Sequence, residues 1–150
     1  MNITPHFTFE ELTNSSSRPD LVEQNRVDAQ NVLKYLKYTA STLEELRAVI
    51  GEPLHVSSGF RNEALNKAVG GSSTSKHKLG LCADIIPASM NTSEAFKLIM
   101  ENRDKCPSLR KCIIEGVKGK TWLHIQAKVD SLEPTTFFKT NDGVNYKEVK

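Results

Sequence analysis

A long amphipathic segment sets the first limit on how this sequence can fold. Between residues 22 and 50, apolar residues recur at steps of three and four, which places them on one face of a helix. These positions are Val32, Leu33, Leu36, Ala40, Leu43, Leu46, Val49 and Ile50. Gly51 and Pro53 follow in the order that ends a helix. A helix with so wide an apolar face needs a second layer to cover it.

Shorter segments supply that second layer. Apolar-rich runs bounded by turn residues predict strands at 54–58, 81–86, 112–115 and 122–129, and a hairpin turn at 141–143. Capping residues predict short helices after the Thr8–Glu11 capping box, at 62–69, and from Asn91 to about residue 102. Because helices come early and strands late, we expect an α+β fold, with the N-terminal helices packed on a small antiparallel sheet.

Length and composition exclude several classes of protein. The 150 residues suit a single domain, and 38% hydrophobic with 25% charged residues is typical of a globular protein, not a disordered one. Twenty Lys and Arg against eighteen Asp and Glu leave a net charge of +2. This balance gives no electrostatic reason to expect nucleic acid or an anionic membrane as the main partner, and we expect a monomer.

The sequence also indicates a compartment. No signal peptide is visible at the start of the sequence, and no run of eighteen apolar residues predicts a membrane span. Cys82, Cys106 and Cys112 are odd in number, so they cannot all pair within one chain. We interpret them as reduced thiols of a chain made in the cytoplasm, while a Cys106–Cys112 bridge stays open.

Two stretches carry residues whose types suit metal chemistry. In the first, His77 and Asp84 stand seven residues apart, and Gly80 between them allows the chain to turn so that the side chains converge. Asp84 lies within an apolar strand, where a carboxylate is costly to bury unless it meets a cation or several donors. Imidazole and carboxylate are both good zinc ligands, so the pair is a candidate for half of a zinc site.

The second stretch is Thr121-Trp-Leu-His-Ile-Gln126. Alternation along a strand places Trp122, His124 and Gln126 on one face, so His124 could complete a His/Asp/His triad with an open fourth position, as in a catalytic zinc site. Glu115, at the end of the preceding strand, is the best-placed general base for an attacking water. Taken singly, each residue also fits a structural role: a hydrogen-bonded turn, a packed histidine or a solvated charge.

Together these residues resemble a known family. The pattern Ser75-x-His77-x-x-Gly80-x-x-Ala83-Asp84, preceded by Ser58-Gly-Phe-Arg61 and followed by Trp122-x-His124, is similar to the zinc D-alanyl-D-alanine carboxypeptidases. That family shares a structural group with lysostaphin-type enzymes and the hedgehog domain. The likeness is closest to a small, often phage-encoded branch, through Phe7–Ser15, Leu65-Asn66 and Val69-Gly-Gly71. It covers about residues 5–130, and the tail after Val129 matches loosely.

The resemblance implies roles for individual residues. His77, Asp84 and His124 would hold one zinc ion. Arg61 would bind the substrate's carbonyl or terminal carboxylate through its fork of donors, and Ser75 would support the site by hydrogen bonds.

Two positions depart from the family pattern. Lys76 stands where many relatives have Gln or Thr, and Thr121 stands where well-studied relatives place their acidic base, three residues before the last histidine. In the phage-type branch a glutamate closes the preceding strand, and Glu115 fits that place.

The resemblance implies a zinc metallopeptidase that hydrolyses an amide bond in peptidoglycan stem peptides. We expect a D-Ala-D-Ala carboxypeptidase-like activity, with an L-Ala-D-Glu endopeptidase as the alternative. Its site of action would be the cell wall, reached by phage-assisted release or as a virion component. Two other hypotheses stay open: a non-catalytic zinc-containing muropeptide-binding module, and a nucleophilic or redox site built on Cys82 with His77.

Overall fold

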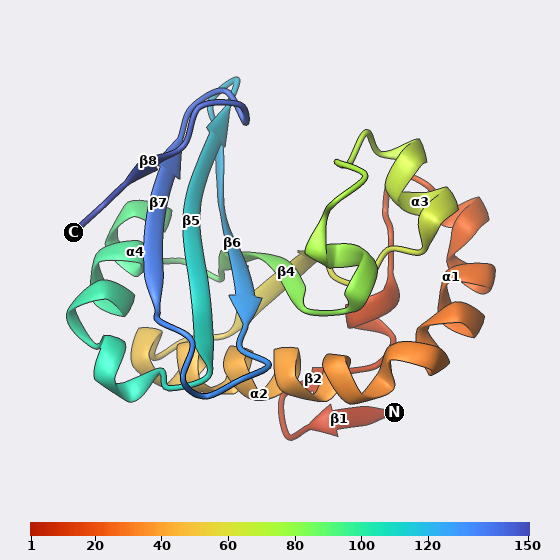
Figure 1. Ribbon diagram of the computed structural model, residues 1–150, viewed down its shortest axis with the longest axis horizontal. Helices are drawn as coiled ribbons and strands as arrows, with labels where there is room; N and C mark the ends of the chain where they lie inside the picture. The colour runs from red at the N-terminus through yellow and green to blue at the C-terminus, as the bar shows by residue number, and fades with distance from the viewer.

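The computed structural model describes residues 1–150 and contains a six-stranded sheet in the order β3-β4-β6-β5-β7-β8 (Figure 1). Its strands are β3 (Leu54–Ser58), β4 (Cys82–Pro87), β5 (Leu109–Val117), β6 (Lys120–Ala127), β7 (Thr136–Thr140) and β8 (Lys147–Glu148). All neighbouring strands are antiparallel except β5 and β7, which run parallel and make the sheet mixed. A separate two-stranded sheet joins β1 (Asn2–Thr4) and β2 (Phe7–Thr8).

Two of the four α-helices cover one face of the large sheet. The α-helices are α1 (Val22–Ala29), α2 (Leu33–Ile50), α3 (Glu63–Ala68) and α4 (Thr92–Glu101). Short 3-10 turns lie at η1 (Glu11–Thr13), η2 (Pro19–Leu21), η3 (Gln30–Val32), η4 (Lys76–Leu79) and η5 (Arg103–Lys105). Helices α2 and α4 pack on each other and on the central strands, and the main hydrophobic core lies between these layers (Figure 1). The predicted α+β class is confirmed. None of the helices is long and apolar enough to cross a membrane.

The predicted helix over residues 22–50 is divided in two. The 3-10 turn η3 separates α1 from α2, and Val32 leaves helical geometry with φ −119° and ψ 18°. The regular apolar positions begin only at Val32. They therefore hold α2 on the sheet and do not extend to α1. Helix α1 buries two apolar residues, Val22 and Ala29, and is also held by a polar anchor. Gly51 ends α2 in the left-handed conformation, as predicted.

That polar anchor is Asn25, which is completely buried. Its side-chain amide donates to the backbone carbonyls of Thr13 and Phe60 at 2.9 and 3.0 Å, and its oxygen accepts from the Asn62 N–H at 2.7 Å. The predicted capping box is present: the Thr8 N–H donates to the Glu11 carboxylate, and the Glu11 N–H donates to the Thr8 hydroxyl. The N-terminal segment is thereby attached to the turn that follows β3.

The hairpins differ from the prediction in detail. Strand β5 is longer than predicted, β6 begins and ends two residues earlier than predicted, and the two turn through Lys118 and Gly119, both with positive φ. The predicted turn at 141–143 joins β7 to β8, but residues 144–146 form a loop and not a strand. Asp142 accepts the N–H groups of both Val144 and Asn145, so these groups are not available for a sheet ladder.

Candidate metal centre

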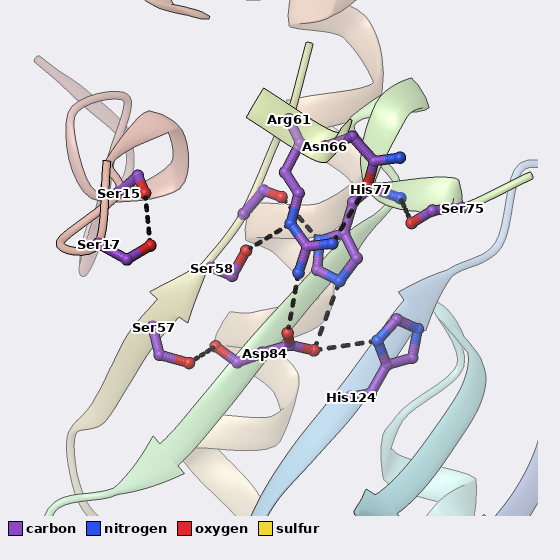
Figure 2. A network of polar contacts seen from close by, with 11 residues as sticks. Ser15, Ser17, Ser57, Ser58, Arg61, Asn66, Ser75, His77, Asp84 and His124 are labelled. Carbon is purple, nitrogen blue, oxygen red and sulfur yellow. Dashed lines mark hydrogen bonds and ion pairs between the residues drawn. The ribbon is translucent and has the colours of Figure 1, made fainter. Parts of the chain in front are cut away.

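Three side chains from three elements meet at one point above the sheet. His77 comes from η4, Asp84 from β4 and His124 from β6 (Figure 2). The Asp84 Oδ1 atom lies 3.0 Å from His124 Nδ1 and 3.4 Å from His77 Nε2. One ligand atom from each residue lies within 4.8 Å of the others. The structure therefore brings together the His/Asp/His set that the sequence predicts.

Sheet register explains how Asp84 and His124 meet. They are direct partners across the antiparallel pair of β4 and β6, so their side chains stand side by side on the same face. His77 reaches them from above through a short turn. The Ser75 hydroxyl caps this turn by accepting the His77 N–H at 3.2 Å, and Gly80, with φ 79°, ends it and returns the chain into β4. Ser75 therefore supports the histidine through the backbone.

The orientation of the His77 ring is fixed by the segment after β3. Its Nδ1 atom lies 2.7 Å from the Gly59 carbonyl oxygen, which can only accept, so the proton is on Nδ1 and Nε2 presents a lone pair to the site. A backbone carbonyl that holds the far nitrogen of a histidine is the usual partner of a metal ligand. The ring is 3% exposed, so this hydrogen bond is shielded from water.

The electrostatics of the cluster suit a cation. Burial would raise the pKa of Asp84, but the neighbouring His77 imidazole and the hydrogen bond from His124 hold that pKa far below its usual range. Burial works against the charged form of His124, yet the hydrogen bond to Asp84 and the neighbouring Cys82 raise its pKa to about 10. Burial lowers the pKa of His77. Asp84 is thus an anion held ready between two nitrogen donors, and a bound divalent cation would replace the proton on His124.

Two imidazole nitrogens and one carboxylate oxygen form a donor set that fits zinc. Three protein ligands leave one coordination position open, which distinguishes catalytic from structural zinc sites. The site can therefore bind a metal ion and still admit a further oxygen ligand.

Arg61 binds the outer side of Asp84 (Figure 2). Its guanidinium donates to Ser58 Oγ at 3.0 Å, Asn66 Oδ1 at 3.3 Å and Asp84 Oδ2 at 3.5 Å. A Cβ on Gly71 would lie 2.1 Å from Asn66 Oδ1 and 2.9 Å from Arg61 Nη1, so only glycine allows this arrangement. Arginine carries five N–H donors and three are used here, which leaves two for a substrate.

A cleft of about 810 Å³ opens over the cluster. Glu115 lies on its wall, half-buried on β5, and burial raises the pKa of this carboxyl above its ordinary value. The charges of His124 and Asp84 act on Glu115, which places it close to the cluster. Thr121 pairs with Gly116, lies three residues from His124 and is therefore on the other face of β6. Of the two positions considered for a base, only Glu115 faces the cleft.

The three cysteines are free and buried, so the Cys106–Cys112 bridge that the sequence left open is not formed. Cys82 is 1% exposed and does not line the cleft, although it lies near enough to His124 to influence its pKa. A substrate in the cleft could not reach the Cys82 sulfur. The structure therefore gives no support to a cysteine nucleophile.

Several residues of the cleft were missed by the sequence analysis. They lie on β5, on β7 and in the loop before β8: Lys111, Ile113, Phe138, Gly143 and Tyr146. Alternation along β5 could have identified the first two, since they share the face of Glu115. The others required knowledge of where the tail of the chain runs.

Fold and cluster together form a candidate mononuclear metal centre, set in an open cleft of an α+β domain. Comparison with family models matches residues 5–117 to "Peptidase M15", and the chain therefore belongs to the M15 peptidase family. Comparison with curated proteins finds no match. The family indicates a peptide substrate and zinc as the metal for the His77–Asp84–His124 cluster.

Proposed function

We propose that this protein is a zinc-dependent peptidase that hydrolyses an amide bond in peptidoglycan stem peptides, with D-Ala-D-Ala carboxypeptidase-like specificity. The observation that carries the proposal is the His77–Asp84–His124 cluster at the base of an open cleft, in a chain of the M15 peptidase family. Delivery to the wall by phage-assisted release, or as part of a virion, stays an expectation from the sequence.

Each residue of the site has a task in this proposal. His77, Asp84 and His124 would hold the zinc, which when bound supplies a Lewis acid that polarises the scissile carbonyl and lowers the pKa of water to about 7. The Glu115 carboxylate accepts a proton from the attacking water and passes it to the leaving nitrogen, so the amide bond breaks without releasing a free amide anion. Arg61 uses its two spare N–H donors on the substrate's carbonyl oxygen or terminal carboxylate.

An L-Ala-D-Glu endopeptidase is the second candidate, and the size of the cleft favours it. About 810 Å³ lies in the upper part of the range of roughly 300–1,000 Å³ for sites that enclose a whole ligand. A cleft of this size accommodates substrate on both sides of the metal cluster. A muropeptide-binding module without catalysis would lack a base, whereas Glu115 faces the cleft with a raised pKa.

Mass spectrometry of defined stem peptides tests the proposal. The zinc-loaded protein is incubated with a pentapeptide stem that ends in D-Ala-D-Ala. Loss of the C-terminal D-Ala supports the carboxypeptidase, and loss of the N-terminal L-Ala supports the endopeptidase. Because both losses have the same mass, fragment spectra of the remaining tetrapeptide assign the end that was removed. An intact pentapeptide after prolonged incubation, with zinc bound at one per chain, would contradict both activities.

A further inference from the structure

Lys111 stands on the floor of the cleft, on the opposite side of the metal cluster from Glu115. Both residues line the cleft from β5, with Ile113 between them. Ile113 is the direct partner of His124 on β6. Asp84, His124 and Ile113 are paired across β4, β6 and β5 and form one row of the sheet. Two residues along a strand span about 6.7 Å, so the backbone positions of Lys111 and Glu115 lie on either side of this row at similar distances.

The Lys111 ammonium lies over the ring of Phe138, 5.4 Å from its centroid. Phe138 on β7 is the parallel partner of Ile113, so the lysine side chain leans along β5 to the level of His124 and toward β7, on the opposite side of β5 from β6. A cation over an aromatic face is held in place without losing its charge. The ammonium therefore occupies a defined position in the cleft, on the β7 side of the metal cluster.

No carboxylate of the protein pairs with this ammonium. Lys111 takes part in none of the ion pairs of the chain. The acidic side chains that line the cleft are Asp84 and Glu115, of which Asp84 binds Arg61 and both histidines, and Glu115 stands across the row. A half-buried, preorganised and unpaired cation in a ligand cleft is suited to an anionic group of the ligand.

Gln126 extends this cation into a small subsite. It is the cross-strand partner of Lys111 on β6, and it also lines the cleft. Its amide can donate to a carboxylate from the β6 side of the cleft, while the Lys111 ammonium can bind it from the β7 side. The two residues together offer a cation and an amide N–H donor for a carboxylate. The apolar Ile113 separates them from Glu115.

We propose that Lys111, with Gln126, binds a carboxylate of the substrate near the scissile bond, on the β7 side of the metal cluster. The inference rests on the proposed peptidase function and narrows its substrate class to peptides with a free carboxylate at that position. Stem peptides carry free carboxylates at the D-Glu residue and at the C-terminus, and amidation removes each charge separately.

The test compares Lys111→Met with Lys139→Met on matched peptides. Lys139 lies on the neighbouring strand β7, is exposed and does not line the cleft, so its substitution removes a strand lysine without touching the subsite. The substrates are a stem pentapeptide with free carboxylates and two versions amidated at D-Glu or at the C-terminus. Urea unfolding of both variants confirms that each is folded.

We expect Lys111→Met to raise the KM for the free peptide by roughly ten- to a hundred-fold with kcat little changed, since one charge-assisted hydrogen bond is lost. The wild type should already have a high KM for one of the two amidated peptides, and Lys111→Met should not raise that KM further. Lys111→Arg should restore most of the KM, and Lys139→Met should match the wild type. If Lys111→Met raises the KM equally for all three peptides, or raises it for none, the inference is overturned.

Binding to the metal-free protein separates this inference from the proposed function. Isothermal titration measures the Kd of the same peptides without any cleavage. A charge-dependent loss of affinity in Lys111→Met supports the carboxylate subsite even if the wild type cleaves none of the peptides, a result that would contradict only the proposed function. If the wild type cleaves the peptides but the Kd changes neither with amidation nor with Lys111→Met, the subsite alone is overturned.

Discussion

Replacing Gly59 with alanine should damage both the fold and the metal centre. A Cβ at this position would lie 2.3 Å from the carbonyl oxygen of Leu12, 2.8 Å from its carbonyl carbon and 2.9 Å from its Cα. A carbon atom normally approaches a carbonyl oxygen no closer than about 3.3 Å, so the two backbones must separate by about 1 Å. Because the obstructing atoms belong to the backbone of a fully buried residue, no side-chain rotation relieves the contact.

That separation breaks a specific hydrogen bond. The Phe60 N–H donates to the Leu12 oxygen at 2.7 Å, and a retreat of 1 Å would lengthen this bond to about 3.7 Å, beyond hydrogen-bonding distance. Overpacking costs about 1–3 kcal/mol and an unsatisfied buried backbone group about 1–3 kcal/mol. We therefore expect Gly59→Ala to lower the free energy of unfolding by about 2–4 kcal/mol in urea titrations.

The same movement reaches the metal centre. The Gly59 carbonyl orients the His77 ring through the 2.7 Å contact with Nδ1, and loss of such a partner typically weakens metal binding about 10–100-fold. Zinc affinity is measured by competition with a chromogenic chelator under conditions where the variant is folded. Gly116→Ala is the control, because its Cβ would make only ordinary contacts, at 3.4 Å to the Thr121 methyl group and 3.7 Å to the Lys120 carbonyl oxygen. Unfolding within about 0.5 kcal/mol of the wild type, together with unchanged zinc affinity, would refute this reasoning for Gly59→Ala.

Four further outcomes are expected. Asn25→Ala leaves three buried backbone groups without their partner and should cost at least about 3 kcal/mol in urea unfolding, whereas Gln24→Ala on the exposed side of α1 should change stability by less than about 0.5 kcal/mol. Glu115→Gln should lower kcat by roughly 10²- to 10⁴-fold in a peptide-cleavage assay while the bound zinc, measured by atomic absorption, is unchanged; loss of zinc would indicate a structural role instead. Burial raises the pKa of Glu115 above its ordinary value of 4.5. Because a base must be ionised, kcat/KM should fall as the pH drops through a value above 4.5. A fall in kcat/KM only at or below pH 4.5 would contradict the assignment of Glu115 as the base. Burial raises the pKa of Cys106 to about 11, and Cys112 is more deeply buried still, so iodoacetamide should label neither thiol in the native protein at pH 7.5; labelling at the rate of a free thiol would contradict the buried reduced state.

The sequence contained most of the metal centre because its parts lie in local patterns. The strand that carries Asp84 is apolar on both sides of it, and a carboxylate in such a run must meet a partner. Gly80 marked the turn that brings His77 back over that strand, and alternation placed His124 on one face of its own strand. These arguments need only spacing and residue type. The register that makes Asp84 and His124 direct partners came from the structure.

The features that could not be predicted depend on contacts between distant segments. Helix α1, before the break, is held by Asn25, which is buried against the turn after β3, some 35 residues away. The parallel placement of β7 depends on a long connection, which no local pattern encodes. That placement brings Phe138 beside Ile113 and so positions the Lys111 ammonium. Long-range packing therefore decided the cleft wall, while local chemistry decided the metal ligands.

Zinc stoichiometry and peptide cleavage, measured together on the wild type and on His124→Ala, test the central claim most directly. The wild type should bind one zinc ion per chain and cleave a stem pentapeptide, and a chelator should abolish cleavage until zinc is restored. His124→Ala should lose both zinc binding and cleavage and keep a cooperative urea transition, because the hydrophobic core is built apart from the cluster. Full cleavage by His124→Ala, or by the chelated wild type, would contradict the account.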